Sequence, residues 1–287
     1  MTYVTHLAIL FLYYVLIAGS QQLLTGYSKL LTVSQAAVVG VGAYAAAIAS
    51  TRYGVPYPVT VMVGSLCAMV LSGMAYALFS RLDSEGVVLA SLAFQIIVME
   101  LILNLEELTN GALGIAGIHS PVYSGAATAS VILITLLICV CAMAFFLYWL
   151  KQSHFGCRLL LIGENRAFAE ALGLHVARDR LIAFILSALM AGAAGGILAH
   201  YLTFIEPSTF GLIESVFVLA IVVIAGSKRI LSLLAVTAVL VVVPELMRFV
   251  AGSGAFSANI RQIVFGCILV FALAAPSFSW RMEHRRK

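Results

Sequence analysis

Apolar runs of about 20 residues recur along the whole chain, and they limit the fold more than any other feature. One of them, Ala129–Leu150, contains no charged residue. A helix needs roughly 20 mostly apolar residues to cross the hydrocarbon core of a bilayer. Only 10% of the 287 residues are charged, whereas a soluble domain is typically about 25% charged. The chain is therefore predicted to be a polytopic membrane protein, because it lacks the charge for a water-facing surface.

The spanning elements are predicted to be helices. Strands of a transmembrane barrel alternate apolar and polar residues, whereas these runs are apolar on every side. A helix also satisfies its own backbone polar groups in lipid. We expect one all-α transmembrane domain over residues 1–287, with about nine transmembrane helices (8–10). They are placed at about 4–22, 30–50, 57–80, 87–105, 127–150, 181–203, 211–226, 231–250 and 260–278. The seventh is short, and is either tilted or only partly spanning.

The basic residues predict an orientation. If the spans alternate, one side receives only Arg52, Arg248 and Arg261. The other side receives Lys29, Arg81, Lys151, Arg158, Arg166, Arg178, Arg180, Lys228, Arg229, Arg281, Arg285, Arg286 and Lys287. Because Lys and Arg mark the cytoplasmic side, we expect the N-terminus outside and the C-terminus inside. The connections 105–126 and 204–211 have no Lys or Arg and are placed outside.

This distribution also explains the formal net charge of +4, which we interpret as a topology signal and not as a sign of nucleic-acid binding. The basic tail RMEHRRK is expected to lie against anionic lipid headgroups. No basic segment precedes the first apolar run, so we expect that run to be a retained helix and not a cleaved signal.

The largest predicted cytoplasmic loop, about 151–180, contains the polar stretch GENRAFAEALGLHVARDR at 163–180. Asn165 is a plausible N-cap for a helix over Arg166–Leu172. Gly173 then occupies the C′ position, where a positive φ is favoured, and Leu174 supplies the apolar contact of a Schellman ending.

This short helix is predicted to seek a partner, because two turns of helix are marginal in water. Phe168, Ala171 and Leu172 form a small apolar face, and the remaining positions around the helix are Arg166, Ala169 and Glu170. The partner is either the headgroup layer or another protein. Anionic lipid would repel Glu164 and Glu170, which favours the protein partner.

Few other polar residues fall within the spans. Gln95, Glu100 and Asn104 lie in the fourth, with the last two at i,i+4 on one face. A carboxylate in a span usually faces a bundle interior or water, so we consider these three residues as candidates for a functional site. Glu100 is near the outer end, and a position in the interface is the alternative.

Glycines mark the second and sixth spans. Close helix packing is the simplest interpretation, and helix sliding during transport is the second. They are Gly40, Gly42, Gly192, Gly195 and Gly196.

No catalytic or nucleotide-binding motif emerges. The sequence has no G-x-x-x-x-G-K-[ST] phosphate loop, no metal-type Cys or His spacing and no nucleophile–base constellation. We therefore expect a non-catalytic chain without a metal or cofactor of its own.

Residues 155–215 resemble the second half of the branched-chain amino-acid ABC transporter permeases of the LivM type. Elements of that pattern stand in order at Glu164–Gly173, Arg180–Phe184, Ala191–Tyr201 and Pro207–Phe210. Two first-half stretches, LLTGYSKLLTVSQAAVVGVGAYAAAI at 23–48 and SLAFQIIVMELILNLEELTNGALGIAGI at 91–118, resemble it too. The likeness covers roughly residues 20–250.

The sequence departs from the family pattern at four places. Lys29 replaces an expected glycine, Ser34–Gln35 stands where Gly-His is usual, and Gly163 takes a usually basic position. The stretch AGSKRILSLLAVTA replaces a glycine-rich one after the seventh span. With a transporter implied, the candidates for a substrate path are Gln35, Gln95, Glu100 and Asn104.

The resemblance implies a permease subunit of a bacterial ABC importer in the cytoplasmic (inner) membrane. It implies a homologous second permease, two cytoplasmic ATPases that bind ATP and Mg, and an external substrate-binding protein that is periplasmic or lipid-anchored. The short loop helix would be the coupling helix, on which Glu164, Asn165, Arg166, Ala169, Glu170 and Gly173 match the family motif.

Three alternatives stay open. Within the same class, permeases for urea or short amides look alike. From another class, an ion-coupled secondary transporter would need an ion site deep in the membrane, where this sequence has few charged residues. A membrane scaffold without transport also fits the composition.

Overall fold

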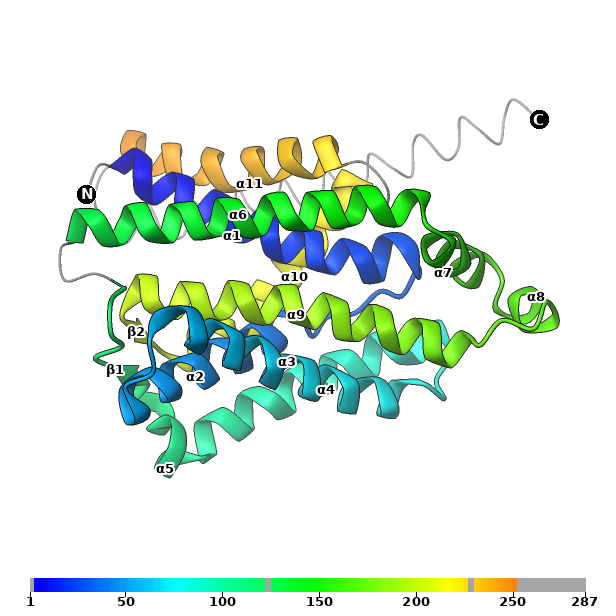
Figure 1. The fold of residues 1–287 in the computed structure, drawn as a ribbon, viewed down its shortest axis with the longest axis horizontal. Coiled ribbons are helices and arrows are strands. Elements are labelled where there is room, and N and C mark those ends of the chain that lie inside the picture. Colours follow the sequence, from blue (N-terminus) through cyan, green and yellow to red (C-terminus); the bar gives the residue numbers. More distant parts are fainter. Residues whose placement is uncertain (1–2, 122–124, 227–229, 252–287) are drawn as a thin grey trace.

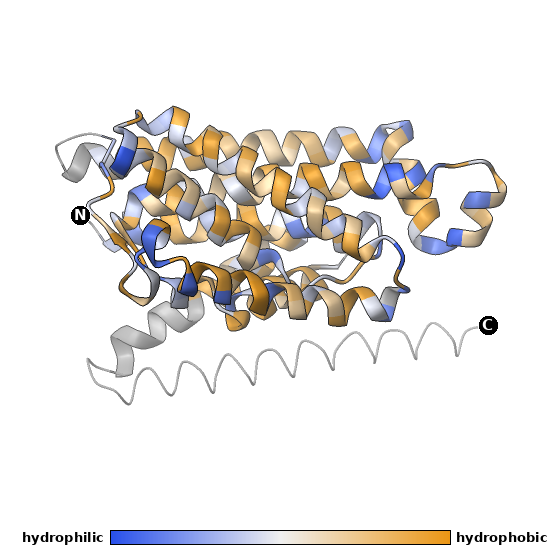
Figure 2. Ribbon diagram, turned by 90° about the horizontal axis from the view of Figure 1, so that it is seen from below, coloured by the Kyte–Doolittle hydropathy of each residue, from blue (hydrophilic) through white to orange (hydrophobic). Residues whose placement is uncertain are grey.

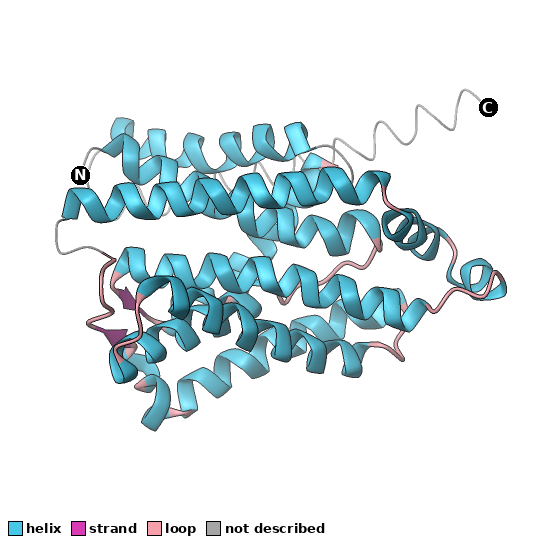
Figure 3. Cartoon of the chain, viewed as in Figure 1, coloured by secondary structure: helices cyan, strands magenta, loops and turns pink. Residues whose placement is uncertain are grey.

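Long apolar helices run along one axis of the molecule (Figure 1), with short connections at the two ends. The computed structural model describes residues 3–121, 125–226 and 230–251. Within these ranges six helices are long and apolar enough to cross a membrane. They are Tyr3–Tyr27, Tyr57–Phe79, Glu85–Asn104, Thr128–Gln152, Val176–Leu202 and Pro207–Ala225. A multi-pass membrane protein is thus confirmed. The colouring by secondary structure shows that it is mostly helical (Figure 3).

The helix bounds follow the sequence pattern with local differences. The long helices of the bundle are α1 (Tyr3–Gln22), α2 (Gln35–Tyr53), α3 (Tyr57–Phe79), α4 (Ser84–Asn104), α6 (Gly125–Gln152), α9 (Val176–Leu202), α10 (Leu212–Ala225) and α11 (Ile230–Ala251). The short 3-10 helix η3 (Pro207–Phe210) leads into α10. The predicted span at 260–278 lies outside the described residues.

The second span begins later than predicted. α1 continues into a π-helix, η1 (Leu23–Tyr27), and the chain then runs without helix to Ser34. Lys29 has φ +50°, a left-handed conformation that L-residues rarely adopt, so a helix cannot continue through it. α2 therefore starts at Gln35, which is buried and bonded to neighbouring helices inside the bundle. Its small residues and polar start make α2 less apolar than the six candidates. It packs against both α3 and α9, which also pack against each other.

Glycines form the contact between α2, α3 and α9. A Cβ built on Gly42 would lie 2.5 Å from Cα of Gly192, and one built on Gly195 would lie 2.1 Å from the carbonyl oxygen of Val39. Two further glycines make tight contacts: Gly40 packs on Phe210, and Gly196 packs on Val61. The backbones of these helices thus touch, which small residues permit in a membrane bundle.

The two connections without basic residues meet at one end of the bundle. The first contains α5 (Glu106–Thr109), η2 (Gly111–Leu113) and strand β1 (Ile115–Ala116), and the second contains strand β2 (Phe204–Ile205). The strands pair antiparallel, with Ile115 opposite Ile205. The prediction that both connections lie on the same side is therefore correct.

The opposite end contains two helices where one was predicted. α7 (His154–Glu164) precedes α8 (Arg166–Ala171), and the two project beyond the spanning helices (Figure 1). Hydrophilic residues gather in this pair and at the helix ends, whereas the middle of the bundle is hydrophobic (Figure 2). The loop predicted at about 151–180 is thus a helical hairpin, and its last residues already belong to α9.

Candidate functional site

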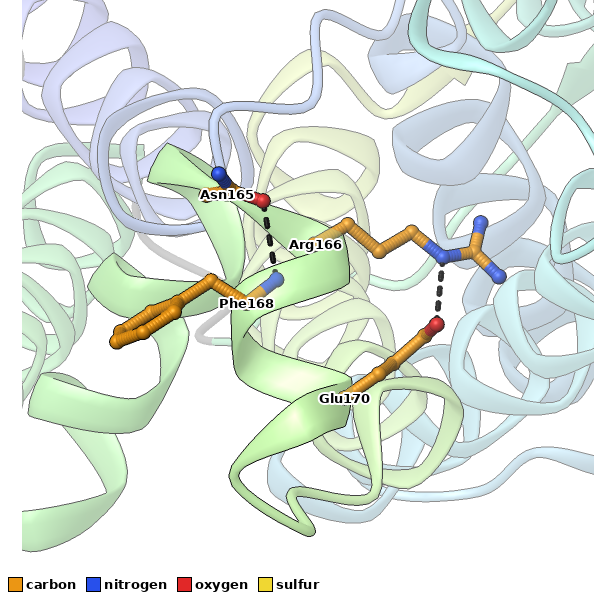
Figure 4. Close-up of polar contacts among 4 residues, drawn as sticks. All are labelled: Asn165, Arg166, Phe168 and Glu170. Carbon is orange, nitrogen blue, oxygen red and sulfur yellow. Dashed lines mark hydrogen bonds and ion pairs between the residues drawn. The ribbon is translucent and has the colours of Figure 1, made fainter.

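The ends of α8 follow local side-chain and backbone chemistry. Asn165 has extended backbone angles, and its Oδ1 accepts a 3.0 Å hydrogen bond from the backbone N–H of Phe168 (Figure 4). Gly173 has φ +78° and donates to the carbonyl of Glu170 at 2.9 Å. The N–H of Leu174 donates to the carbonyl of Ala169 at 3.1 Å. These bonds are those of a Schellman ending, so both predicted helix ends are confirmed.

The outer surface of α8 presents apolar and charged side chains on different sides. Phe168 is 53% exposed and Leu172 is 58% exposed. The Phe168 ring points away from Arg166 and Glu170 (Figure 4), which form an ion pair with Nε and Oε1 2.8 Å apart. This hydrogen bond raises the pKa of Arg166, so its charge is constant near neutral pH. Two large apolar side chains thus lie uncovered at the tip of the molecule.

One residue of α8 faces the opposite way from the prediction. Ala169, which was grouped with the polar positions, is 0% exposed. It packs with Ile162 of α7 and Val176 of α9, beside Leu161 and Leu174. The error arises because α7 was not expected, and α7 supplies the surface that Ala169 covers. Ala171 is exposed, beside the two large apolar side chains.

α7 holds α8 at the end of the bundle. The hydroxyl of Ser153 accepts from the N–H of Gly156 at 3.1 Å and caps α7. Arg158 pairs with Asp179 of α9 at 3.1 Å, and the Asp179 side chain is only 6% exposed. A buried carboxylate with a paired guanidinium gives this attachment a defined geometry. The sequence signal for α7 was present, since a capping serine precedes apolar residues at helical spacing.

Gln95 lies at a buried junction of four segments. Its Oε1 accepts from the N–H of Ala37 at 2.8 Å and from the hydroxyl of Ser215 at 2.9 Å. Its Nε2 donates to the carbonyl of Phe210 at 2.9 Å. The first N–H groups of a helix have no partner within that helix, so Gln95 satisfies the start of α2 inside the bundle. This interaction assigns Gln95 a structural role in this conformation.

Gln35 lies in a second buried polar cluster. Its Nε2 donates to the hydroxyl of Ser20 at 2.6 Å and approaches that of Ser187 at 3.5 Å. The Ser187 hydroxyl donates to the Ser20 carbonyl at 2.8 Å. Gln35 also borders a cavity of about 10 Å³, lined further by Ser34 and Ser72, which is about the space for one water. The buried serines of this cluster were not predicted.

Glu100 and Asn104 are not part of this interior. Both are exposed on the surface of α4, where Asn104 Nδ2 donates to the Glu100 carbonyl at 2.7 Å and reaches its Oε2 at 3.5 Å. In the structure, neither Glu100 nor Asn104 therefore lies with Gln35 or Gln95. The four substrate-path candidates do not form one site within this chain.

Metal-binding geometry does not emerge from the arrangement. Among the residues that the structure describes, no group of three or more His, Cys, Asp or Glu side chains is placed to hold a metal ion.

Comparison with known proteins assigns the chain to a family. The sequence model of the family described as "Branched-chain amino acid transport system / permease component" matches residues 3–273. The chain is 28% identical over 268 residues to the high-affinity branched-chain amino acid transport system permease protein LivM of Escherichia coli K12, covering 84% of this chain and 63% of that protein. LivM of Salmonella typhimurium LT2 is 27% identical over 261 residues, covering 82% and 61%.

A third relative matches a shorter part of the chain. The "probable branched-chain amino acid transport permease protein LivH" of Methanocaldococcus jannaschii is 28% identical over 195 residues, covering 63% of this chain and 61% of that protein. The chain thus spans slightly over three fifths of the length of the curated relatives it matches. Because the family match extends over nearly the whole helical bundle, the chain belongs to the family of branched-chain amino acid transport permease components.

Proposed function

We propose that this chain is a permease subunit of an ABC importer for branched-chain amino acids in a bacterial cytoplasmic membrane. The family assignment and the names of the relatives support the transported class. The chain itself carries no phosphate loop, so ATP and Mg would be bound by two separate ATPase subunits. A homologous second permease and an external binding protein complete the proposed importer.

The single observation that carries the mechanism is the exposed apolar tip of α8. Phe168 and Leu172 are more than half exposed, on a short helix whose other side is anchored by Ala169. Burying a large apolar side chain is worth about 1.5–3 kcal/mol, so this tip fits a hydrophobic groove on another protein. We assign that groove to an ATPase subunit, whose nucleotide-driven closure would displace α8 and shift the spanning helices.

Charge supports the orientation in which α8 is cytoplasmic. The hairpin end of the bundle carries the connection between α3 and α4 as well as α7 and α8 (Figure 1). The segments at this end contain the basic residues Lys29, Arg81, Lys151, Arg158, Arg166 and Arg178. At the other end, the last turn of α2 contributes Arg52. By the positive-inside rule the hairpin end is the cytoplasmic side.

For the translocation path we retain Gln35 as the candidate within this chain. The cavity that it borders is too small for an amino acid in this conformation. A path there requires movement of α2 relative to α3 and α9, since side chains of all three line the cavity. Glu100 and Asn104 would contribute only where the surface of α4 faces the second permease.

The experiment replaces Phe168 in the reconstituted importer. Phe168→Asp is expected to abolish substrate-stimulated ATP hydrolysis, because a carboxylate cannot enter an apolar groove. Phe168→Leu is the matched control and is expected to retain most of the activity. Normal transport by the Phe168→Asp complex would show that α8 is not the coupling helix.

The substrate and the energy source need separate measurements. Calorimetric titration of the cognate binding protein with leucine, isoleucine, valine, urea and acetamide identifies the transported class. Transport by the purified chain along an ion gradient, with neither ATP nor ATPase present, would instead indicate a secondary transporter.

A further inference from the structure

The C-terminal end of α7 rests directly on the backbone at the end of η1. A Cβ built on Gly163 would lie 2.9 Å from the carbonyl oxygen of Tyr27 and 3.0 Å from the carbonyl carbon of Ser28. It would also lie 3.1 Å from Cγ of Lys29. Because glycine has no side chain, it allows this close approach. The two segments are therefore in backbone contact, and neither can move toward the other.

An ion pair spans the same contact. Lys29 Nζ and Glu164 Oε1 are 3.7 Å apart, and both side chains are about half exposed. Glu164 ends α7, where a negative charge opposes the helix dipole, and a nearby cation offsets that effect. Lys29 and Gly163, two of the positions where the sequence departs from the family pattern, are thus neighbours. We define the α7–η1 contact as Tyr27, Ser28, Lys29, Gly163 and Glu164.

On one side, this contact is joined to α8 by a single residue. Asn165 alone separates α7 from α8, and its side chain caps α8. Ala169 and Ile162 belong to one buried cluster, so α7 and α8 move together when α8 is displaced. Packed elements transmit displacement because their interiors are close to incompressible.

On the other side, the contact leads into the buried start of α2. After Lys29 the chain needs only residues 30–34 to reach Gln35. This segment is itself bonded to the bundle: Gln21 Nε2 donates to the carbonyl of Thr32 at 2.8 Å, and the N–H of Val33 donates to Ser91 Oγ at 2.9 Å. A shift of Lys29 therefore reaches Gln35 through a short and restrained segment.

The π-helix η1 interrupts the regular hydrogen bonding at the end of α1. η1 is one π-helical turn at the end of α1, and such turns are rare and often lie at functional sites. It is attached to α6 by the hydroxyl of Tyr27, which donates to the carbonyl of Leu147 at 3.2 Å. A single turn of this kind is the part of α1 best suited to a local rearrangement.

The geometry points to the α7–η1 contact as a positioning contact that passes displacement of α8 to the buried N-terminus of α2. Lys29 and Glu164 act through η1 and segment 30–34. This inference rests on the proposed function of α8. It adds a specific route to the interior beside the covalent connection from α8 to α9.

The test is a charge exchange across the contact in the fully assembled, reconstituted importer. Lys29→Glu and Glu164→Lys each place like charges together, and the double variant restores opposite charges. The readout is the amount of substrate transported per ATP hydrolysed, together with retention of the ATPases on purification. Each single variant is expected to lower this ratio about two- to five-fold, the range of a partly exposed pair, with the ATPases still bound, and the double variant is expected to recover.

Gly163→Ala tests the backbone contact independently. Its added Cβ must separate the two segments, so transport per ATP is expected to fall. Gly73→Ala on α3 is the matched control, because a Cβ there meets nothing within 4 Å. If Gly163→Ala prevents assembly, the Lys29 and Glu164 charge variants alone test the contact. Their side chains are half exposed and do not pack in the core.

The outcomes separate this inference from the proposed function. If Phe168→Asp abolishes coupling while both single charge variants keep the wild-type ratio, the positioning contact is refuted and the coupling helix stands. Failure of the double variant to recover also refutes the contact. If Phe168→Asp leaves coupling intact, the proposed role of α8 is refuted, and the positioning contact that rests on it is refuted too.

Discussion

Replacing Gly192 with alanine tests the central helix contact most directly. The added Cβ would lie 2.6 Å from the Cβ of Ala68, 2.9 Å from the Cα of Ser65 and 3.0 Å from the carbonyl oxygen of Gly64. Carbon atoms pack best at about 3.5–4.0 Å, so α9 and α3 must separate by roughly 1 Å. Backbone atoms cannot rotate out of the way. Overpacking of this kind typically costs about 1–3 kcal/mol.

Gly73→Ala supplies the reference for this measurement. Both substitutions gain the same helix propensity, about 0.5–1 kcal/mol relative to glycine, but the Cβ at position 73 meets nothing within 4 Å. The difference between the two variants therefore isolates the overpacking. In thermal unfolding of the purified chain in one detergent, we expect Gly192→Ala to melt about 2–10 °C below Gly73→Ala. Equal melting temperatures would refute the inferred backbone contact.

The remaining predictions concern the polar junction and the hairpin. Gln95→Leu leaves three buried partner groups unpaired, at about 1–3 kcal/mol each. Thermal unfolding in detergent should therefore occur well below the wild-type temperature, and an unchanged transition would contradict the structural role of Gln95. Asn165→Ala removes the cap of α8 at about 1 kcal/mol, which faster amide hydrogen exchange in α8 would reveal, and unaltered protection would count against the cap. Phe168→Ala should weaken ATPase binding about 5–10-fold in a titration, because about half of a phenylalanine remains to be buried, worth roughly 1–1.5 kcal/mol. Phe145→Ala, 71% exposed on α6, is its control, and equal weakening by both would exclude a specific groove.

The sequence alone was sufficient for features that depend on composition or on neighbouring residues. Long runs that are apolar on every side predicted a multi-pass helical bundle, because a helix satisfies its own backbone polar groups in lipid. The ends of α8 were predictable because Asn165 and Gly173 act within one turn of their own position. The family resemblance followed from ordered motifs, and the family match confirmed it. α7 was also within reach, since its capping serine and apolar spacing are local signals.

Tertiary structure decided which side each residue faces. Ala169 is buried because α7 and α9 lie against it, and this contact depends on how the hairpin folds back. Gln95 and Glu100 are five positions apart on one apolar helix, yet one joins four segments and the other lies exposed. The contact between Gly163 and Lys29 joins segments more than a hundred residues apart in the chain. Long-range packing sets these environments, and a pattern read along one segment does not contain them.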